Sequence, residues 1–182
     1  GLISGGSSYL LAGPDGPITL RNSRGWKPSD ASTPNWDATH AIRTPTGYKV
    51  LLTGAAALSN KFFVWDTNTA GVITNSSGWK TAAQSSSLNW EHTFSKDFDN
   101  NGLISGGSSY LLAGPDGPIT LRGTGGWKPS DASTPNWDAT HAIRTPSGFK
   151  VLLTGAAARS GSFHVWDTNT AGVITNSSGW KT

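Results

Sequence analysis

Three oxygen-bearing side chains stand at alternate positions of the chain, just before a glycine. They are Asp97, Asp99 and Asn101, followed by Gly102. This spacing matches the first half of an EF-type calcium loop, in which alternate oxygens converge on the cation and Leu103 would add its backbone carbonyl. The second half departs from the pattern, because position 12 is Ser108 and not Glu. We therefore expect weak calcium binding here, with a plain Asx-rich turn as the alternative.

The residue types that enzymes use for catalysis occur without the spacing that catalysis needs. The chain has no Cys, and none of its four His has a His or Cys partner at metal-ligand spacing. His40 and His141 are one position in two copies and are best explained as strand residues. No Gly-x-Ser-x-Gly elbow or paired-carboxylate motif is present. The sequence thus predicts no enzymatic activity.

Aromatic side chains offer a second kind of site, because ring faces attract the C–H surfaces of sugars. Phe63 and Trp65 stand two positions apart, and His164 and Trp166 repeat this arrangement. A position in the deep core rarely accepts both Phe and His, so strand alternation places both Trp on an outer face. We keep a two-site carbohydrate-binding module as the alternative function, although Trp is also a large hydrophobe for a small core.

The elements that must position these residues are repeated. Residues 1–81 align with residues 102–182 at a constant offset of 101 and without a gap, and residues 64–81 return unchanged as 165–182. The chain is therefore copy, connector, copy, with the connector at 82–101. We expect it to be an excerpt from a longer array.

Short β-type runs separated by turn residues fill each copy. Residues 8–12 and 17–21 flank a Gly-Pro-Asp-Gly turn, and residues 64–65 and 72–74 flank a second turn. We expect an all-β fold of two tandem antiparallel β-sandwich or meander modules, joined by a short helix-containing connector.

Alternation along the strands predicts which side chains share a face. Trp36, Ala38, His40 and Ile42 should lie together, as should Tyr48, Val50 and Leu52. Phe62 and Val64 should point inward if Trp65 points outward. In the connector, Trp90 and Phe94 stand four positions apart after a Ser-rich lead that could cap a helix, and we expect both to dock on a β unit.

Several of these segments resemble one known family. The chain carries a Gly-Tyr-x-Val run at residues 47–50, a Val-Trp-Asp-Thr-Asn run at 64–68, and Trp90-x-x-x-Phe94 followed by the Asp-rich loop. Together they resemble the tryptophan-rich Synechocystis-type C-terminal repeat of large secreted, calcium-associated bacterial proteins. The resemblance implies a secreted or surface module without enzymatic activity.

Composition narrows the partners. Only 14% of residues are charged, the net charge is +3, and no run of Lys or Arg could follow a phosphate backbone, which disfavours nucleic acid. No apolar stretch reaches the roughly 18 residues of a membrane span. We expect a structural and adhesive repeat of a secreted, cell-surface or matrix protein, one that could form filaments. Its expected partners are further copies of itself, matrix components or glycans.

Overall fold

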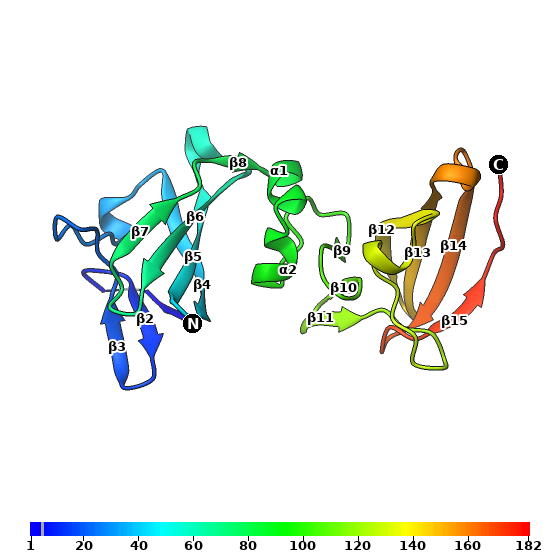
Figure 1. Cartoon of the computed structure of the whole chain (residues 1–182), viewed down its shortest axis with the longest axis horizontal. Helices are drawn as coiled ribbons and strands as arrows, with labels where there is room; N and C mark the ends of the chain where they lie inside the picture. The colour runs from blue at the N-terminus through cyan, green and yellow to red at the C-terminus, as the bar shows by residue number, and fades with distance from the viewer. Residues whose placement is uncertain (5) are drawn as a thin grey trace. The chain divides into compact units, whose positions relative to one another are not determined.

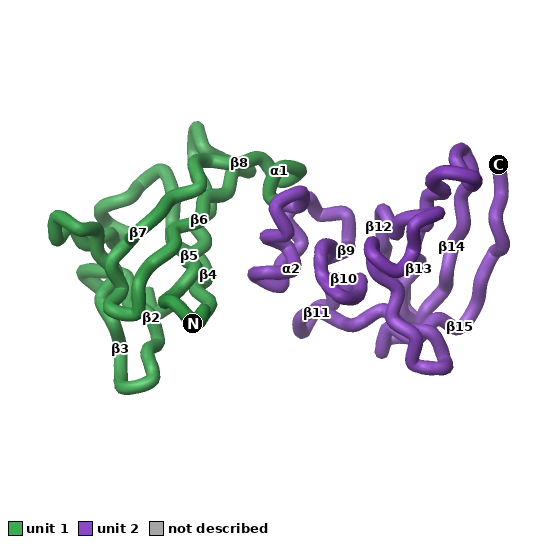
Figure 2. The backbone as a smooth tube through the Cα atoms, viewed as in Figure 1, with its two compact units in different colours: residues 1–85 green, residues 86–182 purple. Residues whose placement is uncertain are grey.

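A computed structural model describes residues 1–4 and 6–182 as two compact units, which are Gly1–Ser85 and Ser86–Thr182. Figure 2 colours them separately. The division falls inside the connector, so residues 86–101 belong to the same unit as the second copy. The predicted all-β class, with two similar modules and a short helical connector, is confirmed.

The first unit contains two antiparallel sheets (Figure 1). The smaller sheet has the order β1-β2-β3, and the larger has the order β4-β5-β6-β7 with β8 paired to β6. The strands are β1 (Leu2–Ile3), β2 (Leu10–Gly13), β3 (Gly16–Thr19), β4 (Trp36–Thr44), β5 (Gly47–Gly54), β6 (Lys61–Asn68), β7 (Ile73–Ser76) and β8 (Lys80–Thr81).

The second unit repeats this plan with sheets of order β11-β10-β9 and β12-β13-β14-β15. Its strands are β9 (Leu103–Ile104), β10 (Leu111–Gly114), β11 (Gly117–Thr120), β12 (Trp137–Thr145), β13 (Gly148–Gly155), β14 (Phe163–Asn169) and β15 (Ile174–Ser177). Each copy also has two single-turn 3-10 helices, at Asp30–Ser32 and Ala56–Leu58 and at Asp131–Ser133 and Ala157–Arg159.

Both predicted hairpins form. β2 and β3 pair from Gly13 opposite Gly16, which leaves Pro14 and Asp15 as a two-residue turn. β6 and β7 pair around the Asp66–Gly71 segment, where the Asn68 side chain accepts hydrogen bonds from the backbone N–H groups of Ala70 and Val72, both at 3.0 Å. The second segment is thus the hairpin turn that its residue types predicted.

The core of each copy contains apolar side chains of both of its sheets. In the first copy Leu11 comes from the small sheet, Tyr9 from just before β2, and Ala38, Tyr48 and Val50 from the large sheet, all less than a tenth exposed. Tyr48 and Val50 therefore share an inward face as predicted, and Leu52, two residues further along the same strand, is 1% exposed. In this region a sandwich is the better of the two predicted descriptions.

A β-bulge corrects the predicted face of β4. The register of β4 against β5 shifts between Ala38 and His40, so Ala38 pairs with Leu52 but His40 pairs with Leu51. An extra residue on one strand reverses the side-chain alternation beyond it. Trp36, Ala38 and Ala41 therefore share the core face, and the prediction that His40 and Ile42 lie with Trp36 is wrong.

The predicted faces of β6 are reversed. Trp65 pairs with Val50 and packs against the core, and its counterpart Trp166 is a core residue with 9% exposure. Phe62 and Val64 alternate with Trp65 and lie on the opposite face of the sheet. The Phe/His difference at 63 and 164 misled the prediction, because a half-buried position at the border of the core accepts either ring.

The connector forms two short helices, α1 (Ala82–Ser87) and α2 (Trp90–Phe94). The Ser-rich lead is part of α1, whose first turn is closed by reciprocal hydrogen bonds between Thr81 and Gln84, so it does not cap α2 as predicted. Asn89 separates the helices with a left-handed backbone at φ 58°. Within the described residues, no helix is long and apolar enough to cross a membrane.

Candidate functional site

The most heavily bonded acidic side chain of the second unit is Glu91, on α2. It is 0% exposed and accepts four hydrogen bonds. Its Oε1 accepts from Ser86 Oγ at 2.8 Å and from the backbone N–H of Phe98 at 3.1 Å. Its Oε2 accepts from the backbone N–H and the hydroxyl of Ser105, at 3.2 and 3.1 Å. Glu91 thereby ties α2 to the segments on either side of it in the chain.

The loop that follows α2 is also fixed to the second copy. The Asn101 carbonyl accepts a hydrogen bond from the backbone N–H of Ala142 at 2.7 Å, and a side chain on Gly102, at φ 82°, would collide with the Ala142 carbonyl. Side chains on Gly106 or Gly107 would likewise collide with Asn89 and His92. The connector therefore packs closely on the copy that follows it, with Phe94 and Phe98 5% and 4% exposed. Of the two residues expected to dock, Phe94 is buried and Trp90 only half-buried.

The predicted calcium loop lies beside Glu91. Asp97, Asp99 and Glu91 each offer one carboxylate oxygen, and these oxygens lie within 4.8 Å of one another. Oδ1 of Asp97 is buried and has no hydrogen-bond partner among the described residues. Burial and the nearby charges of Asp99 and Glu91 raise the pKa of Asp97 above its ordinary value. These groups fit a divalent cation, which prefers oxygen ligands and would neutralise the clustered charge.

Asn101, another predicted ligand, is arranged differently, and Leu103 takes part through its backbone N–H. The Asn101 side-chain oxygen accepts from the Leu103 N–H at 2.7 Å, and its amide group donates to Asp99 at 3.2 Å. Asp97 Oδ2 accepts from the Gly102 N–H at 2.9 Å. These bonds form an Asx-type turn, and they direct the Asn101 oxygen to the backbone. Glu91, which the sequence analysis did not consider, supplies the third carboxylate in its place.

The aromatic residues proposed as a sugar platform pack against other rings. Trp65 makes edge-to-face contacts with Trp26, Trp36 and Phe63, at centroid distances of 6.4, 5.2 and 6.2 Å. Trp166 contacts Trp127, Trp137 and His164 in the same way, at 6.0, 5.1 and 6.0 Å. These contacts place both Trp inside an aromatic cluster, so the predicted exposed position is wrong.

His164 lies at the border of this cluster. Its ring packs on Trp180 at 5.2 Å, its Nε2 lies 2.6 Å from Ser177 Oγ, and its buried Nδ1 has no hydrogen-bond partner among the described residues. Arg159 stacks over the same Trp180, with Cζ 4.8 Å from the ring centroid. Burial, and then the charge of Arg159, lower the pKa of His164 below its ordinary value of 6.5.

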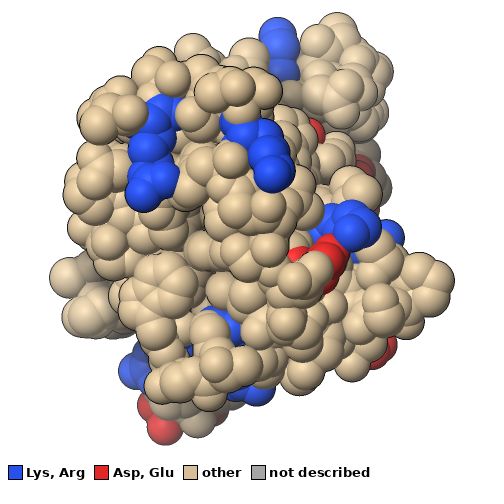
Figure 3. Space-filling model, turned by 90° about the vertical axis from the view of Figure 1, so that its right-hand side faces the viewer, with Lys and Arg blue, Asp and Glu red and all other residues tan. Residues whose placement is uncertain are grey.

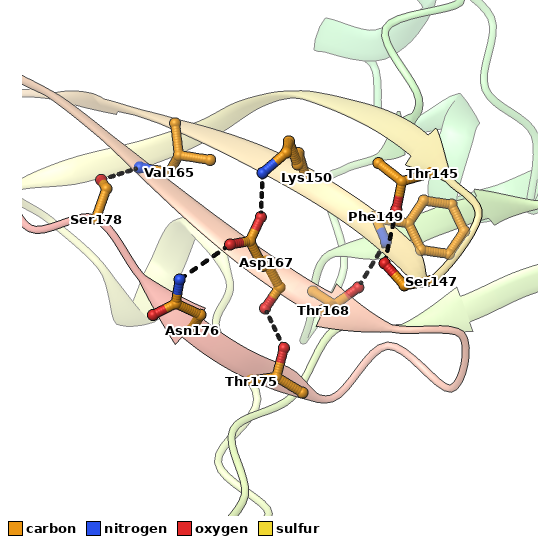
Figure 4. A network of polar contacts seen from close by, with 10 residues as sticks. All are labelled: Thr145, Ser147, Phe149, Lys150, Val165, Asp167, Thr168, Thr175, Asn176 and Ser178. Atoms are coloured by element: carbon orange, nitrogen blue, oxygen red, sulfur yellow. Dashed lines mark hydrogen bonds and ion pairs between the residues drawn. The ribbon is translucent and has the colours of Figure 1, made fainter.

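A polar hollow that the sequence analysis did not identify occurs in both copies. In the second copy Asp167 accepts from Lys150 Nζ at 2.5 Å and from the Asn176 amide at 3.1 Å (Figure 4). These residues and Phe149 line a hollow of about 490 Å³. In the first copy the Lys49–Asp66 distance is 2.6 Å, and the hollow measures about 500 Å³. The signal in the sequence is that both sets of lining residues are unchanged between the copies, apart from Thr46, which becomes Ser147, and Tyr48, which becomes Phe149.

Replacing His164 by Phe, the residue of the first copy, should flatten the pH dependence of stability. A folded-state pKa below 6.5 means that the contribution of His164 is fully present above pH 6.5 and is lost as the pH falls through the folded-state pKa. The loss in the parent chain should be below about 1 kcal/mol, because solvent screens a partly exposed ring. Urea unfolding from pH 7.5 to 5 measures it. His141→Phe is the matched control, and an unchanged slope in His164→Phe would contradict the assignment.

No protein-family model, no curated protein and no solved structure matches this chain. The resemblance to the tryptophan-rich repeat therefore stays a prediction that rests on the residue patterns alone. The contacts of the connector and of the duplicated sheets are the observations that bear on function.

Proposed function

We propose that the chain is a structural and adhesive repeat of a secreted, cell-surface or matrix protein, in which a connector completes the copy that follows it. The proposal rests on a position that holds the same residue in both copies but differs in solvent exposure. Ile104 of the second copy is 2% exposed, whereas Ile3, at the same position of the first copy, is 43% exposed. Because the copies match there, residues outside the copy must cover Ile104.

We assign that cover to the connector residues of the second unit, because they contact the residues that directly follow Ile104. Glu91 is hydrogen-bonded to Ser105, the residue after Ile104, and Gly106 and Gly107 lie against Asn89 and His92. A module of this kind depends on its neighbour in the chain, as modules of repeat proteins do. Such an array suits a structural role, with partners that are further copies or matrix components.

The proposal is tested by comparing residues 86–182 with residues 102–182. Loss of the connector should lower the free energy of unfolding by about 3 kcal/mol, because Leu103 and Ile104 lose their cover. Urea unfolding followed by Trp fluorescence measures it.

If the shorter fragment does not fold, residues 86–182 are compared instead with their Glu91→Ala variant. The free energy of unfolding should fall by about 2–3 kcal/mol, because backbone donors are left unsatisfied. Ser86→Ala, which removes a single donor and leaves Glu91 in place, is the milder control. Equal stability of the two fragments, or of Glu91→Ala and its parent, would refute neighbour dependence.

Calcium is the cation that we propose for the three carboxylates beside the joint, by which we mean the contact of connector residues 86–101 with the second copy. Their clustering, the unpartnered Asp97 oxygen and the spacing of Asp97 and Asp99 support it. Asp97, Asp99 and Glu91 would hold the ion, which would supply charge neutralisation and rigidity to the joint. With few ligands we expect a dissociation constant at the weak extracellular end, about 10⁻⁴ to 10⁻³ M.

At about 10 mM calcium the free energy of unfolding should therefore rise by about 1.5–2.5 kcal/mol. Calorimetric titration and thermal unfolding measure the effect, with magnesium as the competing cation. Asp97→Asn and Asp99→Asn should abolish it, whereas Asp116→Asn, in a hairpin turn, should not. If the stabilisation is missing, or persists in Asp97→Asn, the loop is an Asx turn only.

Glycan binding is the second candidate, and the duplicated hollows favour it. Each hollow combines an ammonium, a carboxylate, an amide and several hydroxyl groups, a mixture that can pair with the hydroxyls of a sugar. The aromatic residue in each is Tyr48 or Phe149. The candidate thus shifts from the packed Trp65 and Trp166 to the polar end of the large sheets.

A glycan array probed with the whole chain tests this candidate. Binding to at least one glycan should fall by about tenfold or more in the double variant Asp66→Asn/Asp167→Asn, because each site loses its charged acceptor. Asp15→Asn/Asp116→Asn changes the same net charge in two turns and serves as the control. A signal that is absent, or that survives the first pair, removes glycan binding.

A further inference from the structure

One face of the large sheet differs in exposure between the two copies. Four apolar side chains, Ile143, Leu152, Phe163 and Val165, lie on the face of the second sheet that is turned away from its core; we call them the outer sheet face. The register places them together, because Leu152 pairs with Val165, Thr154 with Phe163 and Ile143 with Lys150.

The outer sheet face of the second copy is exposed, and its twin in the first copy is buried. Phe163 is 48% exposed and Phe62 is 7% exposed. Leu152 and Val165 are half-buried, whereas Leu51 and Val64 are 0% and 4% exposed. Ile143 is 62% exposed, whereas Ile42 is half-buried. All four positions hold the same residue in both copies.

Few charged side chains lie on the side of the second unit that carries β14 and β15. Figure 3 views the molecule from the side on which β14 and β15 lie in Figure 1, and charged side chains there are few and separated by uncharged surface. The outer sheet face carries one ion pair, Lys150 with Asp167, at its polar end. An exposed apolar patch on a sheet face is typical of an interaction surface.

The identity of the copies indicates what covers such a face. The cover of Leu51, Phe62 and Val64 must come from outside residues 1–81, because the same residues of the second copy stay open. The connector is the segment that leaves the first copy at this place: Lys80 of β8 pairs with Phe62, and α1 begins at Ala82 in the same compact unit. In the second copy Lys181 forms the equivalent bridge with Phe163.

We infer that the outer sheet face of the second copy is a docking surface for a connector-type segment, a short helical peptide with the aromatic spacing of residues 82–101, supplied by another module. Trp90 is the aromatic residue of that segment that is only half-buried, and its ring matches the apolar face in chemistry. This inference rests on the proposed function and adds the second half of the joint. Glu91 of a connector would complete the copy after it, and α1, which starts within the first unit, would cover the outer sheet face of the copy before it.

A fluorescent peptide of residues 82–101, titrated into the whole chain and followed by anisotropy, tests the inference. We expect saturable binding that is weakened about tenfold or more by Phe163→Lys and by Ile143→Lys, both at exposed positions that should leave the fold intact. Circular dichroism checks the fold. A peptide carrying Trp90→Ala should lose the binding.

Ile3→Lys is the matched control, because Ile3 is an exposed apolar residue of the first copy. If binding is retained in Ile3→Lys and lost in Phe163→Lys, the inference stands. Absent binding, binding that survives Phe163→Lys, or binding lost only in Ile3→Lys overturns it. Self-association of the whole chain that Phe163→Lys removes would make a second copy, and not the connector, the occupant. None of these outcomes depends on whether residues 86–182 are more stable than residues 102–182.

Discussion

The joint between the connector and the second copy depends on one buried carboxylate. Removing a charged group from water is costly, and the cost is offset only when the group keeps its hydrogen bonds. Glu91 keeps four, from Ser86, Phe98 and Ser105. These donors lie five residues before, seven residues after and fourteen residues after Glu91 in the chain. The carboxylate can therefore be buried only if α2, the Asp-rich loop and the start of the second copy come together. The same arrangement buries Leu103 and Ile104 and brings Asp97 and Asp99 close to Glu91.

The parts of the fold that local chemistry determines could be predicted from the sequence. The two hairpins form because Pro, Asp, Asn and Gly stand where the turns need them, and the tandem plan follows from the ungapped repeat. Tyr48 and Val50 share a face because no irregularity interrupts β5 between them. Trp90 and Phe94 form a helix with the predicted spacing, although it is a single short turn.

The predictions failed where packing, and not the local residue type, decides the position of a side chain. A bulge after Ala38 moves His40 and Ile42 to the other face, and no residue type at that place announces it. Trp65 was assigned outward from a Phe/His difference, but position 63 lies at the border of the core, where either ring fits between two Trp. Glu91 was missed because a glutamate in a short helix is usually solvated, and its partner Ser105 lies beyond the loop.

Residues that are identical in the two copies differ in solvent exposure, so the two ends of a copy are not equivalent. Ile3 and Ile104 differ at the start of the copies, and Phe62 and Phe163 differ on the outer sheet face, in opposite senses. The first copy is open where the second is covered, and the second is open where the first is covered. Surfaces of this kind are heterologous, since the two sides of a joint are different patches. Contacts of that type extend an array one module at a time unless rotation closes a ring. A lone copy would leave apolar surface exposed at both places, so the same side chains would contribute to stability and to assembly.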